Sequence, residues 1–471
     1  MLSERNTIKM SGSESKLPKR MIDEYLDIVD SRTGKKYTVP INNNSVAATD
    51  FSVIIASNDP GSPTPSGDTG LRIFDQGFKN TACVKSSITY VDGIRGRIYY
   101  RGNSILELFD NNDYEEVLHL LIWGHLPSPD EKASLRQALS AAMGAPKSVV
   151  DAIQAFPRDS MTSPMIIAGL AAYAALDEGS FKTHNSSAAY YLGNLKAVDA
   201  AIIRSLSALA TTVALVYCHK RNRDFTKPQK DGSFIGNLLL MMGVSDEHTE
   251  RCLQSLWVLY ADHEMTNSTS AFLHSASNLT DPVSCMIAGV VSAYGPLHGG
   301  KVKRDLRQQH LKRDIDCAID LAYQDYRRIG STENVPAFIA SVKDHKQRLF
   351  GYGHRVYKTV DPRSSAILGM LHKTIEETHQ QESPFLQIAL EIDRVANSDS
   401  YFVSRKIKAN ADLFGSLLYT ALGFETDIII ALACVSRIGG AMAHWREAMQ
   451  QTPVLWRPQQ LYVGPLPDVR E

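Results

Sequence analysis

Chemically capable side chains gather in four segments of the C-terminal half of the chain. The first, residues 260–270, is a polar stretch in apolar surroundings and contains His263 and Asn267. A separation of four residues places both on one face of a helix, so we expect them to lie together. A ligand-binding face would use them in this way, and a capped helix start at the surface is the alternative.

The second segment, residues 294–300, surrounds His298 with glycines. Glycines let a ligand approach the main chain closely, and a helix that follows such a turn offers free N–H donors. This pattern favours a binding turn with one imidazole in it. A surface histidine in an ordinary turn is the alternative.

The third segment, residues 351–363, combines a histidine with cations. Gly351 and Gly353 precede His354, and Lys358 and Arg363 follow it. Bare backbone beside cationic side chains suits phosphates or carboxylates. A solvated basic loop has the same composition.

Two isolated charges enter apolar runs. In the fourth segment, residues 410–415, Asp412 leads into an apolar stretch, and Arg437 is the only charge within residues 428–445. A charge in an apolar helix needs a partner, which is either a bound anion or a structural ion pair. For Asp412, a helix cap is the simpler alternative. The mid-run arginine and its polar neighbours favour a buried helix over a membrane span.

The length and composition of the chain limit the kind of fold that can position these residues. A chain of 471 residues exceeds one hydrophobic core, and 44% apolar with 21% charged residues excludes a wholly disordered protein. Fifty basic and 51 acidic residues give a net charge of −1, which argues against nucleic acid as a partner. The six cysteines form no CxxC pair, so we expect reduced thiols.

The expected elements are mostly helical. Residues 87–91 and 97–100 have strand character around Asp92-Gly93, which predicts a β-hairpin. Ser128-Pro129-Asp130-Glu131 has the form of a capping box that begins a helix. Long Ala/Leu-rich helices are expected over three stretches, residues 165–176, 200–217 and 235–242. Residues 57–70 are rich in turn formers and predict a linker.

In order and spacing, these segments resemble the citrate synthase family from about residue 71 to residue 464. The resemblance rests on Gly77-Phe-Lys-Asn-Thr-Ala, Tyr100-Arg-Gly, Asp262-His-Glu, Gly295-Pro-Leu-His-Gly, Gly351-Tyr-Gly-His-Arg-Val-Tyr-Lys-Thr-Val-Asp-Pro-Arg363, Asn410-Ala-Asp and Arg457-Pro-Gln-Gln-Leu-Tyr462. It implies an all-α, two-domain helical fold with a small N-terminal β-hairpin. The implied parts are a peripheral segment (1–67), a large domain (68–298), an inserted small domain on the coenzyme A side (299–410) and a return to the large domain and dimer partner (411–471).

The resemblance also implies a reaction. Family members join the α-carbon of an acyl-CoA to the keto carbon of oxaloacetate and then hydrolyse the thioester. Because a thioester α-proton is only feebly acidic, a carboxylate must remove it while donors stabilise the developing oxyanions. By motif match, Asp412 is the expected base, His298 the donor to the thioester oxygen and His354 the donor to the ketone oxygen.

Binding residues and partners follow from the same match. Oxaloacetate contacts are expected from His263, Asn267, Arg363, Arg437 and Arg457, and coenzyme A contacts from Gly351, Gly353 and Lys358. Arg457 would reach the site of a neighbouring subunit, which implies a homodimer. No metal is implied, nor any cofactor beyond the coenzyme A thioester as co-substrate.

One departure leaves the acyl donor open. Where most members continue with Ala-Asn-Glu, residues 301–313 hold six cations and one acid. These cations are either a solvated helix face or a surface that attracts coenzyme A or an acidic acyl carrier protein. The products considered are citrate, 2-methylcitrate from propionyl-CoA, and longer 2-alkylcitrates.

Two other functional classes are alternatives. A catalytically silent scaffold or sensor would have no use for a base, so the retention of His298, His354 and Asp412 together argues against it. A metal-dependent hydrolase would need ligand clusters that the sequence does not show.

The expected location is the cytoplasm. Basic residues and serines among the first twenty faintly suggest a mitochondrial presequence, but Glu4 and Glu14 interrupt it. No apolar core suits a secretory signal, and the final Val-Arg-Glu is not a peroxisomal signal. The mitochondrion therefore remains the alternative.

Overall fold

A computed structural model describes residues 24–55, 70–185, 189–295, 298, 318–344, 349–354, 356–379 and 383–464. It divides into two units, one formed by Met1–Lys85 with Arg457–Glu471 and the other by Ser86–Trp456. The predicted linker at residues 57–70 lies outside the described residues except for Gly70. The domain boundary expected at residue 298 lies beside undescribed residues, the boundary expected at residue 410 lies in the described part, and both stay predictions.

The first unit contains a small antiparallel hairpin. Strand β1 (Tyr25–Val29) pairs with β2 (Lys36–Pro40), and the 3-10 helix η1 (Ala48–Val53) follows. The segment that begins at Arg457 belongs to this unit, and Arg72 contacts it by donating a hydrogen bond to the Gln460 carbonyl at 3.0 Å.

The second unit begins with a three-stranded antiparallel sheet of β3 (Thr89–Asp92), β4 (Arg97–Tyr100) and β5 (Asn103–Ser104). The β3–β4 pair confirms the predicted hairpin. The Asp92 carboxylate closes its turn by accepting hydrogen bonds from the backbone N–H groups of Ile94 (3.1 Å) and Arg95 (2.9 Å). These bonds satisfy the turn amides that no strand pairs.

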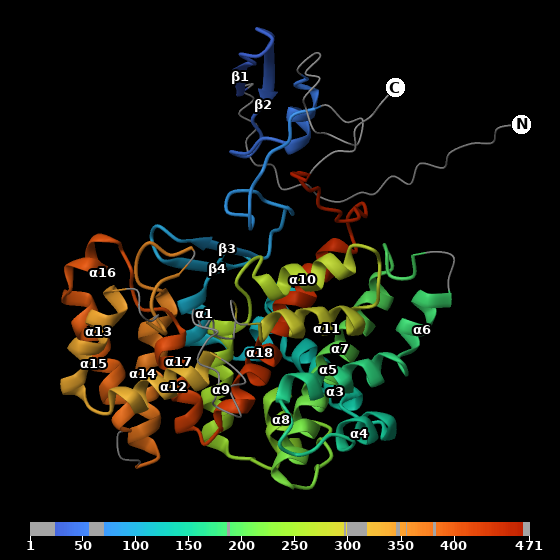
Figure 1. The fold of residues 1–471 in the computed structure, drawn as a ribbon. Coiled ribbons are helices and arrows are strands. Elements are labelled where there is room, and N and C mark those ends of the chain that lie inside the picture. Colours follow the sequence, from blue (N-terminus) through green and yellow to red (C-terminus); the bar gives the residue numbers. More distant parts are fainter. Residues whose placement is uncertain are drawn as a thin grey trace, which may run out of the picture. The chain divides into compact units, whose positions relative to one another are not determined.

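Helices make up most of the second unit, as predicted (Figure 1). The first set is α1 (Ile105–Asn111), α2 (Tyr114–Trp123), α3 (Pro129–Ala142), α4 (Lys147–Gln154), α5 (Thr162–Ala174), α6 (Glu178–Asn185), α7 (Leu195–Arg221), α8 (Phe234–Met242), α9 (Glu247–Tyr260), α10 (Asn267–Ala276) and α11 (Pro282–Ala293). The second set is α12 (Ala318–Ile329), η2 (Thr332–Asn334), α13 (Val335–Lys343), α14 (Pro362–Glu377), α15 (Pro384–Ser398), α16 (Ser400–Ser404), α17 (Asp412–Ala421) and α18 (Thr426–Ala448).

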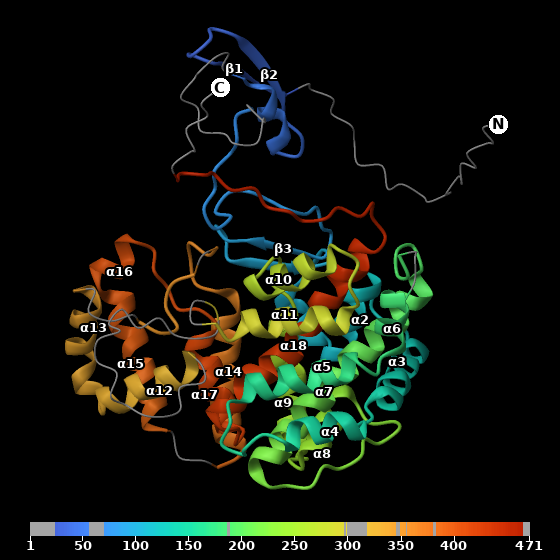
Figure 2. The same ribbon diagram turned by 45° about the vertical axis from the view of Figure 1, so that its right-hand side comes forward.

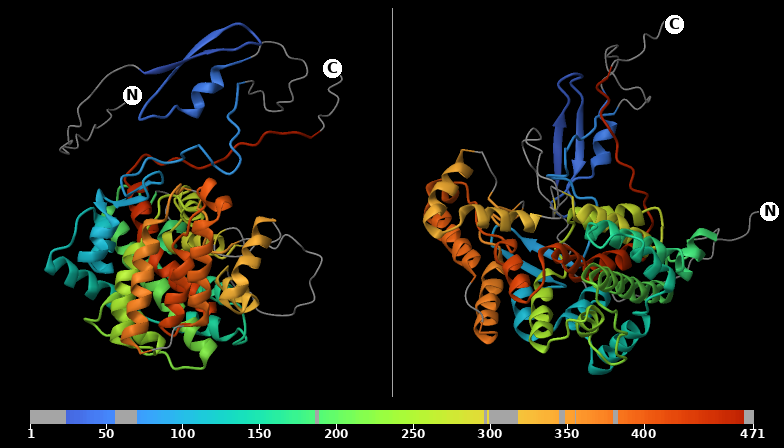
Figure 3. Two further views of the ribbon diagram at one scale, coloured as in Figure 1. Left: turned by 90° about the vertical axis from the view of Figure 1, so that its left-hand side faces the viewer. Right: turned by 60° about the horizontal axis from the view of Figure 1, so that its bottom comes forward.

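Helices α13, α15 and α16 lie together on one side of this unit, away from α4 and α8 (Figures 1 and 2). In the left view of Figure 3 this gold-to-orange group faces the viewer. Helix α18 runs through the interior and packs against α2, α7, α10 and α17. This helix therefore contacts members of both the first and the second set of helices.

The predicted helix signals are confirmed at the capping box before α3. The Ser128 hydroxyl accepts from the Glu131 N–H at 3.3 Å, and Glu131 accepts from the Ser128 N–H at 2.8 Å. Each side chain thereby satisfies an amide that the helix leaves unpaired.

Two helices, α7 and α18, are long and apolar enough to cross a membrane by length and composition alone. The most apolar 18-residue segment is 89% buried inside the fold in α7 and 78% buried in α18. Burial of this extent is typical of core helices, as the sequence predicts for residues 428–445.

Glycines let α18 approach its neighbours closely. A Cβ on Gly439 would meet Leu118 Cδ1 of α2 at 2.3 Å, and a Cβ on Gly440 would meet Asp262 Oδ1 at 2.2 Å. Side chains at these positions would push α18 away from α2 and from the 261–266 segment. That segment carries His263, so the two glycines help to hold it in place.

Candidate active site

A cavity of about 340 Å³ lies in the second unit, where four helices (α10, α11, α17 and α18) meet the segments around residues 263 and 350–354. Six side chains selected from the sequence line it, namely His263, His298, His354, Arg363, Asp412 and Arg437. They come from separate segments, so the fold brings together what the sequence disperses. The cavity has a polar part and a larger apolar part.

Asp412 is the first residue of α17. Its side chain caps no amide, and its own N–H donates to Asn410 Oδ1 at 2.9 Å. Among the described residues its carboxylate has no hydrogen-bond partner, so the helix-cap alternative is wrong. The carboxylate lines the cavity, where partial loss of surrounding water raises its pKa, while Arg363 and Arg437 act in the opposite direction.

Asn410 fixes where α17 begins. Its amide Nδ2 donates to the Gly353 carbonyl at 3.0 Å, and its backbone N–H donates to the Gly351 carbonyl at 2.8 Å. The turn before His354 is thereby joined to the residue two positions before Asp412. These bonds tie the predicted base and the predicted ketone donor to one piece of backbone.

His354 has a defined hydrogen-bonding direction. Its Nδ1 accepts from the backbone N–H groups of Val356 at 3.0 Å and Tyr357 at 3.4 Å. A backbone amide can only donate, so Nδ1 carries no proton and the neutral ring holds its proton on Nε2. Burial, helped by the nearby charge of Arg363, lowers the pKa of His354 to about 4. The ring is therefore neutral near pH 7 and presents an N–H donor.

His298 follows the C-terminal end of α11. Its Nε2 lies 3.2 Å from the Ser268 hydroxyl. Burial and the charge of Arg437 lower its pKa, so the imidazole is neutral near pH 7. Ser268 is a residue that sequence reasoning missed, because a serine in a polar helix turn has no distinguishing pattern.

His263 lines the cavity, but it does not share a helix face with Asn267. Glu264 has a left-handed φ of 54°, and the Thr266 side chain caps α10, which begins only at Asn267. The prediction of one helical face is therefore wrong: the chain turns between the two residues. Asn267 is exposed and its Oδ1 accepts from the Ser292 hydroxyl, so it does not line the cavity.

His263 is held among aromatic rings. Its Nε2 lies 2.8 Å from the Tyr357 hydroxyl, and its ring centroid lies 5.2 Å from that of His354. Burial and the charges of Arg363 and Arg437 hold its pKa well below the ordinary value. Three neutral imidazoles thus line a cavity that also contains two guanidinium groups.

The two arginines are anchored differently. Arg363 forms a bidentate pair with Asp361, through Nε at 3.0 Å and Nη2 at 2.7 Å. Arg437 donates through Nε to the Tyr260 carbonyl at 2.7 Å. No carboxylate of the described residues lies within ion-pair distance of Arg437, so the structural-ion-pair alternative finds no support in this part of the chain. Two orientated guanidinium groups can bind anionic groups of a ligand.

The remaining predicted residues lie outside the cavity lining. Arg457 is exposed and belongs to the first unit, while Lys358 is exposed in the second. Gly351 and Gly353 adopt φ angles of 71° and 79°, which favour glycine in this turn. Their proposed roles with oxaloacetate or coenzyme A stay predictions. The basic segment 301–313 lies outside the described residues.

A buried ion pair supports the loop that carries His263. His444 Nε2 of α18 lies 3.3 Å from Asp262 Oδ2. The Tyr100 hydroxyl donates to the Asp262 carbonyl at 2.8 Å and accepts from the Asp262 N–H at 3.1 Å. Although burial opposes both charges, the pair raises the pKa of His444 and lowers that of Asp262 to about 2.

Replacement of His444 by Ala is expected to lower the free energy of unfolding by about 3 kcal/mol, because it leaves a buried carboxylate unpaired. The loss has a defined pH window. The contribution of His444 is complete below the ordinary histidine pKa of ~6.5 and is lost as the pH rises through the higher folded value. The contribution of Asp262 is complete above an ordinary pKa of 3.8 and is lost as the pH falls towards about 2.

Denaturant unfolding at several pH values should therefore show the largest difference in unfolding free energy between His444→Ala and wild type between about pH 4 and pH 6.5. A difference that does not change with pH would contradict an ionic role. His444→Gln, which keeps a donor without the charge, is the control.

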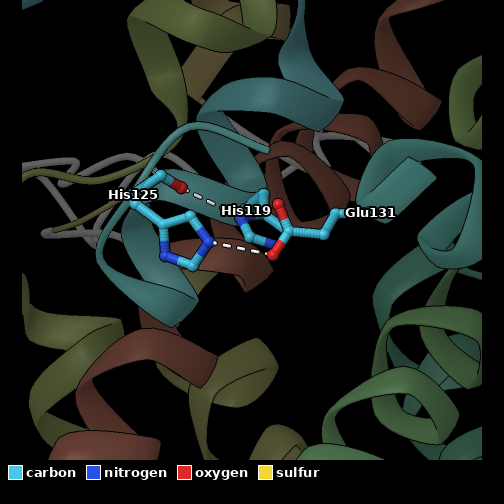
Figure 4. Close-up of side chains that lie close together, drawn as sticks. All are labelled: His119, His125 and Glu131. Carbon is cyan, nitrogen blue, oxygen red and sulfur yellow. Dashed lines mark hydrogen bonds and ion pairs between the residues drawn. The ribbon is translucent and has the colours of Figure 1, made fainter. Parts of the chain in front are cut away.

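A cluster of His119, His125 and Glu131 lies away from the cavity (Figure 4). Its candidate ligand atoms lie within 4.8 Å of one another. Each group already has a protein partner: His119 Nδ1 contacts the His125 carbonyl at 2.9 Å, and His125 Nε2 pairs with Glu131 at 3.1 Å. Glu131 also completes the capping box. These contacts account for the cluster as the connection between α2 and α3.

The apolar part of the cavity was not predicted. It is lined by Leu209, Phe272, Met286, Gly289, Val290, Tyr419, Ile429, Ile430, Ala433 and Cys434. In the sequence these residues have the same spacing as ordinary core residues of amphipathic helices. No sequence signal separates a wall of a cavity from a packed interior.

Comparisons with known proteins found similar sequences and a similar fold. Residues 77–459 match the family model described as citrate synthase, C-terminal domain. The chain is 43% identical over 464 residues to the citrate synthase-like protein oryE of Aspergillus oryzae, covering 97% of this chain and 99% of that protein. It is 38% identical over 449 residues to the alkylcitrate synthase tstJ of Talaromyces stipitatus, covering 95% of this chain and 96% of that protein. Citrate synthase from Thermoplasma acidophilum, which was solved as a ternary complex with carboxymethyl coenzyme A and oxaloacetate, has a similar fold. Its TM-score is 0.72 at 26% identity, and the match covers 84% of this chain and 97% of that chain.

Proposed function

Since the chain belongs to the citrate synthase family, we propose that it joins the α-carbon of an acyl-CoA to the keto carbon of oxaloacetate and then hydrolyses the thioester. The product is citrate or a 2-alkylcitrate. The observation that carries this proposal is the meeting of one unpartnered carboxylate, three neutral imidazoles and two guanidinium groups in one cavity. A protein that only binds anions would need the guanidinium groups but not the free carboxylate.

Condensation begins with removal of a proton. The carboxylate of Asp412 takes the α-proton of the thioester, and the enolate oxygen accepts a hydrogen bond from His298. A neutral His298 suits this task, because a charged ring would give up its proton to the enolate. Enclosure raises the pKa of Asp412, which makes it a stronger base than a carboxylate in water.

Carbon–carbon bond formation follows. The enolate carbon attacks the ketone carbon of oxaloacetate, whose oxygen accepts a hydrogen bond from His354 Nε2 and becomes the hydroxyl of the product. Arg363 and Arg437 bind the two carboxylates and hold the ketone towards the enolate. Water then cleaves the thioester, releasing free coenzyme A and the new carboxylate.

Release of free thiol tests this reaction. Purified protein is expected to release coenzyme A when acyl-CoA and oxaloacetate are both present, followed with a colorimetric thiol reagent. Acyl-CoA without oxaloacetate is the control, because simple thioester hydrolysis would not need the keto acid. An absence of release with every acyl donor from acetyl to octanoyl would favour the silent scaffold and overturn the proposal.

The proposed active form is a homodimer in which Arg457 of one subunit completes the oxaloacetate site of the other. The sequence motif around Arg457 supports it, as does the exposure of this side chain in a single chain. Light scattering after size-exclusion chromatography should give twice the 52.0 kDa mass of one chain. A fully active monomer would contradict this arrangement.

A further inference from the structure

We propose that the apolar arm of the cavity holds the alkyl tail of a medium-chain acyl thioester and that Gly289 and Ala433 limit its length. The apolar arm is the part of the wall formed by Leu209, Phe272, Met286, Gly289, Val290, Tyr419, Ile429, Ile430, Ala433 and Cys434. The inference rests on the proposed condensation and names its acyl donor.

The arm begins at the reacting groups and leads away from them. Three helices show this direction independently: Asp412 starts α17, Arg437 lies on α18, and His298 follows α11. On each of these helices, the lining of the apolar arm continues with residues that lie further along the helix from Asp412, Arg437 or His298.

On α17, Tyr419 follows Asp412 by seven residues, and on α18, Ile430 precedes Arg437 by seven. Seven residues of helix span about 10 Å. Because a short loop joins α17 to α18, the two helices form a hairpin whose walls run together from the charged end to the apolar end. A substituent on the carbon that Asp412 deprotonates would extend along this wall.

The lining of the arm suits an apolar ligand group. The Tyr419 hydroxyl already accepts from Trp257 Nε1 at 2.9 Å, and the Ser416 hydroxyl donates to the Asp412 carbonyl at 3.3 Å. Burial raises the pKa of the Cys434 thiol to about 12, so it stays uncharged. With these polar atoms partnered or neutral, nothing in the arm requires a polar ligand.

Size decides between acetyl and longer donors. An extended chain advances ~1.2 Å per bond, so 10 Å of wall matches about eight bonds. A cavity of ~150 Å³ holds benzene, which is about 25 Å³ per carbon. By that measure 340 Å³ holds roughly 14 non-hydrogen atoms, and oxaloacetate uses nine of them, which leaves about five for the acyl group. The two measures bracket donors of about four to eight carbons, and acetyl would leave the arm empty.

Small residues keep the arm open. Gly289 lies on α11 with ordinary helical geometry, and a Cβ there would rest at 3.5 Å from the Ser268 carbonyl oxygen and 3.6 Å from Phe272 Cβ. A Cβ at this position therefore makes only ordinary contacts with α10, and a longer side chain would take up space beside Phe272 in the arm. Ala433 of α18 is the other small residue that lines the arm.

The test measures kcat/KM for acetyl-, propionyl-, butyryl-, hexanoyl- and octanoyl-CoA with saturating oxaloacetate. For the wild-type enzyme we expect a maximum between butyryl and octanoyl. For Gly289→Leu we expect the maximum to move to shorter donors, with a loss of about 10–200-fold for each methylene that no longer fits. Ala433→Leu, on a different helix, is expected to give the same shift, so that misfolding of one variant does not leave the question open. Ala133→Leu, on the exposed face of α3, is the matched control and should keep the wild-type profile.

The outcomes separate this inference from the proposed function. A maximum at acetyl-CoA in the wild type, or a chain-length profile that neither substitution changes, would overturn the inference while the condensation stands. Absence of thiol release with all donors would overturn the proposed function itself. A shift towards shorter donors in folded variants, checked by circular dichroism, supports both.

Discussion

Asp412→Asn is expected to lower kcat for thiol release by about 10²–10⁴-fold while leaving the affinity for oxaloacetate largely intact. The amide has the size of the carboxylate but cannot accept the α-proton. The backbone bond from the Asp412 N–H to Asn410 is unaffected, so α17 still begins at the same residue. Steady-state kinetics give kcat, and isothermal titration calorimetry gives the dissociation constant for oxaloacetate.

Asp427→Asn is the matched control for this experiment. Asp427 lies in the first turn of α18, pairs with Arg221 and lies outside the cavity lining. Its replacement should leave kcat unchanged. If Asp412→Asn retained wild-type turnover, or lost oxaloacetate binding together with its fold, Asp412 would be a structural residue and the proposed mechanism would be wrong.

Arg437→Met is expected to raise KM for oxaloacetate by about 10²-fold or more, equivalent to about 3 kcal/mol, because an anionic group would lose its partner in an enclosed site. The same change is not expected to lower the melting temperature. A half-buried guanidinium that pairs with no carboxylate of the described residues carries a desolvation cost. The apolar methionine removes this cost, which offsets the lost hydrogen bond to the Tyr260 carbonyl. The KM for oxaloacetate should therefore rise while the melting temperature does not fall.

Arg446→Met, on the same helix, provides the comparison. Arg446 pairs with Asp199 at 2.7 Å and does not line the cavity, so its loss should leave KM unchanged and lower the melting temperature slightly. Thermal unfolding and oxaloacetate titrations of both variants check the pair of expectations. A destabilised Arg437→Met with normal KM would show that Arg437 serves the fold.

Much of the fold was predictable because its signals are local. The capping box before α3, the turn at Asp92 and the apolar periodicity of α7 depend on residues within a few positions of one another. The same holds for Arg437, since a single charge in an apolar helix is visible without any tertiary information. The structure confirms the capping box, the turn and the helix, and it shows Arg437 in the cavity lining.

The site was predictable only in part, for physical reasons. Helical spacing predicts that His263 and Asn267 share one helix face. They do not, because Glu264 is left-handed and the Thr266 side chain caps a helix that begins only at Asn267. The apolar arm was not predictable at all, because a cavity is defined by side chains that are too short to meet. Gly289 has no sequence context that distinguishes it from a glycine at a helix–helix contact.

The backbone bonds to His354 have a consequence for how the enzyme meets its substrate. Two main-chain N–H groups occupy one ring nitrogen, so the imidazole cannot rotate or exchange tautomers without giving up both contacts. The side of the ring that carries the proton is therefore settled when the chain folds, before any keto acid arrives. An arriving carbonyl meets a donor that is already aimed, and little reorganisation remains for the reaction step.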